Sequence, residues 1–127
     1  MDYISDILIR IKNANQAHKP LVALPYSDLG VAIGEALAKA GYTGAPEKKG
    51  KRQKLIELPL VYENGEPKIR GVKRLSKQSK RVYTGASGLR PVRNGFGKII
   101  VSTSKGVMSG EDAKKEQIGG EVLFEIW

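Results

Sequence analysis

The spacing of apolar residues changes along this chain, and that change limits the possible folds more than any other feature. Within the first 40 residues, apolar side chains recur at helical spacing over residues 4–14 and 29–40, with a short strand-like run at 21–24 between them. Farther along, apolar residues occur in short runs separated by Gly, Pro and Asn, which is typical of strands. One short helix is expected after Ser109. The sequence therefore predicts an α+β fold.

A polar segment at residues 76–80 interrupts the apolar pattern, and we expect the chain to divide there. Residues 1–76 are predicted to form an N-terminal α/β domain, with two helices packed on a small sheet. Residues 77–127 are predicted to form a mainly-β C-terminal domain with one short helix.

Several local features fill in these two domains. We expect a second strand to begin within residues 42–45, a basic hairpin tip at 48–52 and a hairpin turn at Asn64 and Gly65. Residues 85–97 are rich in glycine, with a tight turn expected at 94–97. The last strand, 121–127, is expected to alternate, with Leu123 on the face opposite Phe124.

The excess positive charge is concentrated in the middle of the chain. The whole chain has 22 Lys and Arg against 13 Asp and Glu, and residues 47–106 hold 16 of those basic residues and only four acidic ones. A clustered excess of this kind is typical of a surface that binds a polyanion. A solvated basic face is the alternative interpretation.

Several classes of protein lack support in this sequence. Cysteine is absent, which excludes disulfides and cysteine-based zinc sites and fits a reducing compartment. His18 is the single histidine, and the sequence has no metal-ligand spacing and no phosphate-binding loop motif. No apolar run approaches the roughly 20 residues of a membrane span. We therefore predict no catalytic residue, metal, cofactor, small-molecule substrate or membrane partner.

The most informative short stretch follows the apolar run at residues 98–101. It consists of Ser102, Thr103, Ser104, Lys105 and Gly106. Hydroxyls suit 2′-hydroxyls, phosphate oxygens and base edges, lysine adds a point charge, and glycine lets another backbone approach closely. These residues are candidates for RNA contact. A turn made of ordinary turn-forming residues is the alternative.

Four further residues, Tyr83, Arg81, Arg10 and Asn13, are candidates for RNA contact. Tyr83 follows Lys80 and Arg81, and an aromatic ring beside cations can stack on an unpaired base, although a core tyrosine is equally compatible with the pattern. Arg10 and Asn13 lie three apart on the polar side of the first helix. They could reach a phosphate or a 2′-hydroxyl, or simply face solvent.

The stretch Ser-Thr-Ser-Lys-Gly-Val-Met at residues 102–108, followed by residues 111–115 and Gly-Gly-Glu-Val-Leu at 119–123, is the most specific motif of the chain. With residues 2–14, 25–27, 64–67 and 69–76, it resembles the bacterial-type family of ribosomal small-subunit protein eight. The match covers nearly the whole chain in the expected order. Residues 85–89 depart from it, because the family usually has a more charged segment there.

This resemblance implies a partner and a site. It implies a structural component of the small ribosomal subunit, in the cytoplasm, that binds the central domain of small-subunit ribosomal RNA and contacts neighbouring ribosomal proteins. It also implies that residues 102–106 meet an irregular RNA core, with Tyr83 and Glu121 nearby. Some family members repress translation of ribosomal-protein messages that mimic this RNA site.

Two other classes of function remain to be distinguished from RNA binding. A protein–protein adaptor with a basic face would bind its partner regardless of competitor RNA. An enzyme using Ser104 as a nucleophile would need a general base and would show turnover that Ser104→Ala abolishes.

Overall fold

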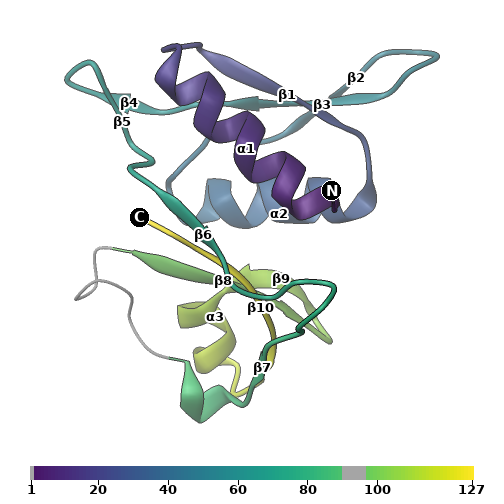
Figure 1. The fold of residues 1–127 in the computed structure, drawn as a ribbon, viewed down its shortest axis with the longest axis vertical. Helices are drawn as coiled ribbons and strands as arrows, with labels where there is room; N and C mark the ends of the chain where they lie inside the picture. The colour runs from purple at the N-terminus through teal and green to yellow at the C-terminus, as the bar shows by residue number, and fades with distance from the viewer. Residues whose placement is uncertain (1, 90–96) are drawn as a thin grey trace. The chain divides into compact units, whose positions relative to one another are not determined.

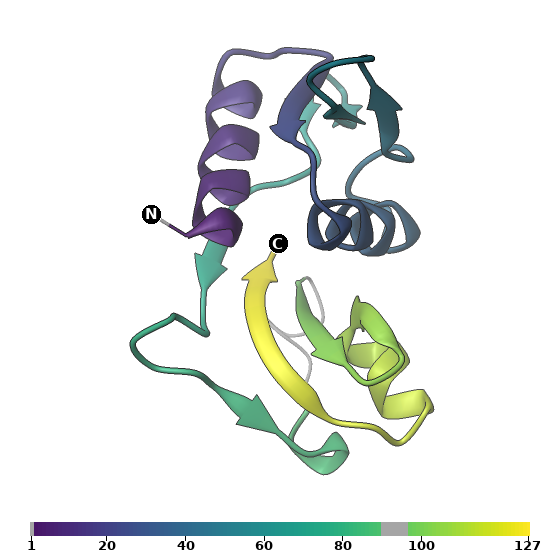
Figure 2. The same ribbon diagram turned by 90° about the vertical axis from the view of Figure 1, so that its right-hand side faces the viewer.

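The computed structural model describes residues 2–89 and 97–127, and its contacts divide the chain into two compact units, Met1–Arg70 and Gly71–Trp127. Both units combine helix with antiparallel strands, so the predicted α+β class is confirmed (Figures 1 and 2). The turn expected at residues 94–97 lies mostly outside the described residues. Residues 72–74, which lie inside the range expected for the N-terminal domain, pair with the last strand and belong to the second unit.

Two capped helices form the helical part of the first unit. In α1 (Tyr3–Gln16), the Asp2 carboxylate accepts a hydrogen bond from the backbone of Ser5, and in α2 (Asp28–Lys39) the Ser27 hydroxyl accepts one from Gly30, both at 2.9 Å. Such caps satisfy backbone N–H groups that have no partner within the helix. The two predicted helices are therefore confirmed.

The sheet of the first unit has three strands in the order β1 (Leu21–Pro25), β3 (Leu55–Pro59) and β2 (Glu47–Lys49). Alternate residues of β1 and β3 are buried. A methyl group added at Gly30 would come within 2.9 Å of the Ile56 side chain, so α2 lies very close to the buried face of β3. The core of this unit therefore forms between the sheet and its helices.

The expectation for residues 42–45 was wrong, because that stretch makes only an isolated bridge, from Thr43 to Leu60. The strand forms later, as β2, and it includes the first two lysines of the expected hairpin tip. The predicted turn at Asn64 and Gly65 is confirmed, since it joins β4 (Tyr62–Glu63) to β5 (Glu66–Pro67) with both residues at positive φ.

The second unit is built around its last strand. β10 (Gly120–Ile126) pairs on one edge with β6 (Val72–Arg74) and β7 (Tyr83–Thr84), and on the other with β8 (Lys98–Thr103). β9 (Gly106–Ser109) extends the sheet beyond β8. A short 3-10 helix, η1 (Ala86–Gly88), follows β7. The predicted short helix, α3 (Gly110–Lys115), begins directly after Ser109, whose hydroxyl caps it.

The expected alternation of the last strand was wrong at Leu123. The register between β10 and β8 shifts between Val122 and Phe124, which places a bulge at Leu123. A bulge turns consecutive side chains away from strict alternation. Val122, Leu123 and Phe124 are consequently all buried. α3 contributes Ala113 to an apolar cluster with Val101 of β8 and Leu89.

Candidate nucleic-acid interface

The predicted loop at residues 102–106 is the tip of a β-hairpin. Ser102 and Thr103 end β8, Gly106 begins β9, and only Ser104 and Lys105 form the turn between them. The Thr103 hydroxyl donates to the Gly106 carbonyl at 2.7 Å and accepts from the Lys105 N–H at 3.1 Å. Gly106 has a φ of +118°, which glycine tolerates best. Thr103 and Gly106 therefore build the turn.

The remaining polar side chains of this tip take little part in contacts within the described residues, and Ser102 is half-buried whereas Ser104 and Lys105 are exposed. In the part of the chain that the structure describes, the hydroxyls of Ser102 and Ser104 make no intramolecular hydrogen bond, and Ser104 is exposed. Lys105 reaches Glu116 at only 4.0 Å, and both side chains are about half exposed or more. An exposed pair at this distance holds a lysine weakly. The two serines and Lys105 are available to a ligand.

Tyr83, Glu121 and Ser102 lie in one row across three strands. Tyr83 of β7 pairs with Glu121 of β10, and Glu121 pairs with Ser102 of β8. Directly paired residues of antiparallel strands project from the same face of a sheet. The chain thus brings together three candidates that are far apart in sequence. We call this row, with Arg81, Ser104 and Lys105, the row surface.

Tyr83 exposes 69% of its surface, the largest value among the exposed large hydrophobic side chains of the described residues. The core alternative for this tyrosine is therefore excluded. A large aromatic ring held on a strand and open to solvent is suited to stacking.

Glu121 is the most constrained member of the row surface. Its Oε2 atom accepts hydrogen bonds from the Ser76 hydroxyl at 2.5 Å and from Arg81 Nη1 at 3.0 Å. Burial alone would raise the pKa of Glu121, but the two hydrogen bonds and the charges of Arg81 and Arg74 outweigh it and hold the pKa below its ordinary value. Glu121 is thus an ionised hydrogen-bond acceptor that binds the Arg81 guanidinium.

Ser76 is the site residue that the sequence analysis missed. It is fully buried and joins Glu121 to the backbone of Val82. Nothing near it in sequence indicates a partner 45 residues away. Its polar neighbours instead made it part of an expected domain boundary.

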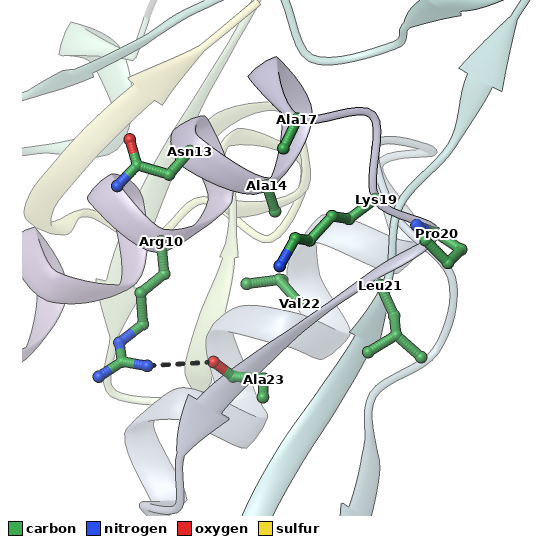
Figure 3. A pocket seen from close by; sticks show the side chains of 9 residues that line it. All are labelled: Arg10, Asn13, Ala14, Ala17, Lys19, Pro20, Leu21, Val22 and Ala23. Atoms are coloured by element: carbon green, nitrogen blue, oxygen red, sulfur yellow. Dashed lines mark hydrogen bonds between the residues drawn. The ribbon is translucent and has the colours of Figure 1, made fainter.

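Arg10 and Asn13 lie on the first unit, at a groove of about 650 Å³ between α1 and β1. Arg10 pairs with Asp6 at 3.0 Å and reaches the Ala23 carbonyl at 3.5 Å. The Lys19 side chain extends into the space between the helix and the strand (Figure 3). The groove is therefore lined by two cations and an amide, although Arg10 also pairs with Asp6 of the same helix.

The basic hairpin between β2 and β3 is a second cationic feature of this unit. Lys48 and Lys54 lie over the Tyr26 ring, at 5.3 and 5.7 Å from its centroid, and Lys49 pairs with Glu47 at 3.3 Å. Lys51 and Arg52 occupy the exposed loop.

The described residues contain no group of His, Asp and Glu able to hold a metal ion. No described helix is long and apolar enough to cross a membrane.

Comparison with known proteins shows which family this sequence matches. The sequence model of the family described as ribosomal protein S8 matches residues 2–127. The chain is 45% identical to the small ribosomal subunit protein uS8 of Mycoplasmopsis agalactiae over 99% of this chain and 97% of that protein. It is 42% identical to uS8 of Erythrobacter litoralis and 44% identical to uS8 of Halorhodospira halophila, each over 99% of this chain and 97% of the relative. The chain therefore belongs to the ribosomal protein S8 family.

Proposed function

We propose that this protein is a structural, non-catalytic component of the small ribosomal subunit that binds ribosomal RNA through the row surface. One observation carries the proposal most directly. The exposed Tyr83 ring, the Glu121 carboxylate and the Ser102 hydroxyl share one row beside a hairpin tip whose serines have no partner among the described residues.

The chemistry of this surface favours RNA over an acidic protein partner. RNA with unpaired nucleotides offers base faces for stacking, base edges for hydrogen bonding and 2′-hydroxyls that both donate and accept. Tyr83 supplies a stacking platform, Ser102 and Ser104 supply small polar groups, and Lys105 supplies a phosphate contact. A carboxylate in the row is an acceptor only, so Glu121 suits an amino group or a 2′-hydroxyl.

The finer target that we propose is the central domain of small-subunit ribosomal RNA, at a helix with an irregular internal loop. The sequence resemblance suggests this target, and the physical character of the row surface supports it. Hydroxyls and a tyrosine read unpaired nucleotides, whereas a continuous duplex would need mainly phosphate contacts. The protein would then act in the cytoplasm, within the ribosome, beside neighbouring ribosomal proteins.

The groove of the first unit is a second proposed contact. Arg10 and Lys19 offer positive charge, and Asn13 offers an amide, at a concave surface that a ribose–phosphate backbone could enter. Contacts of this kind position an RNA strand without reading its sequence. We expect this groove to add affinity, and the row surface to add specificity.

Footprinting of small-subunit ribosomal RNA with the purified protein tests the proposal. We expect protection to centre on an irregular helix of the central domain, and Ser104→Ala to weaken that protection selectively. Protection spread evenly over duplex regions would contradict the proposal. If a protein partner stays bound to this protein in the presence of excess competitor RNA, that result would favour the adaptor class.

The same recognition surface would allow repression of a messenger RNA that carries a similar irregular element. We propose this as a second role, because a protein that reads a local RNA shape cannot distinguish the molecule in which that shape occurs. Adding the ribosomal RNA fragment to a translation reaction repressed by this protein should relieve the repression. Repression that persists at saturating fragment would contradict this role.

A further inference from the structure

The segment between β6 and β7 leaves the sheet and returns to it as a closed turn. The backbone groups of Lys77 and Lys80 bond to each other twice, at 2.9 and 3.0 Å. Lys77, Lys80 and Arg81 are exposed along this excursion, whereas Ser76 at its base has no exposed surface. A strongly basic loop is thus attached to the sheet at a buried hydroxyl.

The Ser76 hydroxyl links the start and the end of this loop to β10. It donates to Glu121 Oε2 at 2.5 Å and accepts from the Val82 N–H at 3.1 Å. The Val82 carbonyl in turn accepts from the Val122 N–H at 2.9 Å. Val82, the residue before Tyr83, therefore has both its N–H and its carbonyl hydrogen-bonded, and Ser76 supplies the partner of the N–H.

We infer that Ser76 is a positioning residue for RNA recognition, which fixes the backbone that presents Tyr83 and Arg81 without touching RNA itself. The inference rests on the proposed function, because it requires Tyr83 to contact RNA. Removing the hydroxyl would leave the Val82 N–H without its acceptor and would take from Glu121 Oε2 one of its two donors, Arg81 being the other. The loosened segment would then have to be ordered during binding, and that ordering reduces affinity.

The state of Glu121 supports this role for the hydroxyl. Because Glu121 is ionised, it can only accept, so the Ser76 proton must point toward the carboxylate. The lone pairs of the hydroxyl are then available to the Val82 N–H. Arg81 donates to the same carboxylate oxygen at 3.0 Å. Glu121 Oε2 therefore binds both Ser76, where the loop begins, and Arg81, where it ends.

Ser76→Ala tests the inference, with Ser109→Ala as its matched control. Ser109 is also a buried serine of the second unit, but its hydroxyl caps α3 by accepting from Asp112 at 3.2 Å. We expect Ser76→Ala to weaken binding to the central-domain fragment by about three- to tenfold, as one lost hydrogen bond allows. The dependence of affinity on salt should not change, because no cation is removed. Ser109→Ala should lower stability and leave the affinity of the folded protein unchanged.

Hydrogen exchange of the free protein supplies a readout that does not involve RNA. The Val82 amide should exchange faster in Ser76→Ala, whereas the amides that join β8 to β10 should keep their protection. If Ser76→Ala does not fold, Ser76→Cys retains nearly the same volume with only a weak hydrogen-bonding group, and the same two changes are expected.

A double variant decides whether Ser76 acts through Tyr83. In a Tyr83→Ala background, Ser76→Ala should cause little further loss of affinity, because the presented ring is already absent. Two results would overturn the inference while the proposed function stands. In one, the affinity losses of Ser76→Ala and Tyr83→Ala multiply in the double variant. In the other, Ser76→Ala folds and binds RNA as tightly as the natural chain. If the natural chain shows no preference for the central-domain fragment, the proposed function fails, and the positioning role fails with it.

Discussion

The Thr103 hydroxyl donates a hydrogen bond to the Gly106 carbonyl at 2.7 Å and closes the turn at the tip of the β8–β9 hairpin. Ser104 is the next residue, and its hydroxyl makes no intramolecular hydrogen bond within the described part of the chain. Two adjacent hydroxyls of one motif therefore have different surroundings. By our proposal, one stabilises the hairpin and the other contacts RNA.

Thr103→Val and Ser104→Ala should separate these two roles. Thr103→Val keeps the shape of the side chain and removes its hydrogen bonds, so we expect the free energy of unfolding to fall by about 1 kcal/mol. Ser104→Ala should change the free energy of unfolding by less than about 0.5 kcal/mol. It should nevertheless weaken binding to cognate RNA by roughly 1–2 kcal/mol. Urea denaturation and RNA titration measure the two quantities.

An equal loss of affinity for cognate and scrambled RNA in Ser104→Ala would mean that the hairpin tip is only a turn. The row surface would then have to recognise RNA through its other members, with no contribution from Ser104.

Tyr83→Ala should reduce RNA binding and leave the fold intact. The ring is 69% exposed, so its loss removes little buried apolar area. If the ring stacks on a base, the change should weaken cognate binding by roughly 1–3 kcal/mol. Tyr83→Phe is the matched control, because it retains the stacking face and should retain most of the affinity. A Tyr83→Ala protein that unfolds but binds normally in its folded fraction would contradict the stacking role.

The lowered pKa of Glu121 predicts a particular pH dependence of stability. A carboxyl whose pKa falls on folding stabilises the protein above its ordinary pKa of 4.5, and this contribution is lost as the pH falls through the lowered value. The difference in unfolding free energy between the natural chain and Glu121→Gln should therefore be constant near neutrality. It should shrink as the pH falls below 4.5 and through the lowered pKa of Glu121. Carboxyl NMR titration of Glu121 checks the direction, and Ser76→Ala should move the pKa upward. A difference that grows on acidification would contradict it.

The sequence predicted those parts of the fold that depend on short-range signals. The caps at Asp2, Ser27 and Ser109 and the turn at Asn64 were predictable because each joins residues within a few positions of one another. The bulge at Leu123 was not, because it depends on the register between two strands and has no local signature.

The candidate site shows the same limit. Hydroxyls in a hairpin motif are visible in the sequence, but the pairing that places Tyr83, Glu121 and Ser102 in one row arises only when three strands assemble. Ser76 was missed for the same reason. Its importance lies in partners far along the chain.

Gly120→Ala should disturb the row surface, whereas Gly85→Ala should not. A methyl group at Gly120 would lie 2.1 Å from the Ser102 carbonyl oxygen, and a methyl group at Gly85 would meet nothing within 4 Å. Gly85 also has a φ of −79°, which any residue adopts. We expect Gly120→Ala to push β8 from β10, lower the thermal midpoint and weaken cognate RNA binding. An unchanged midpoint in Gly120→Ala would show that the strands shift at little cost.

Lys51→Ala should change RNA binding through charge alone. Lys51 lies in the exposed loop between β2 and β3, whereas Lys114, the matched control, lies on the exposed side of α3, outside both proposed contact regions. Both variants lose one positive charge. If the loop contacts phosphate, Lys51→Ala should weaken cognate and scrambled RNA alike and lower the salt slope by up to about one unit.

Lys114→Ala should leave the salt slope nearly unchanged, because Lys114 is not among the residues of the proposed contact regions and each unit of slope reports one lost phosphate contact. Titrations at several salt concentrations with both RNAs separate the outcomes. Equal slopes for the two variants would mean that the basic hairpin contributes only general attraction. A loss in Lys51→Ala confined to cognate RNA would instead make the loop part of specific recognition, which its charge alone does not explain.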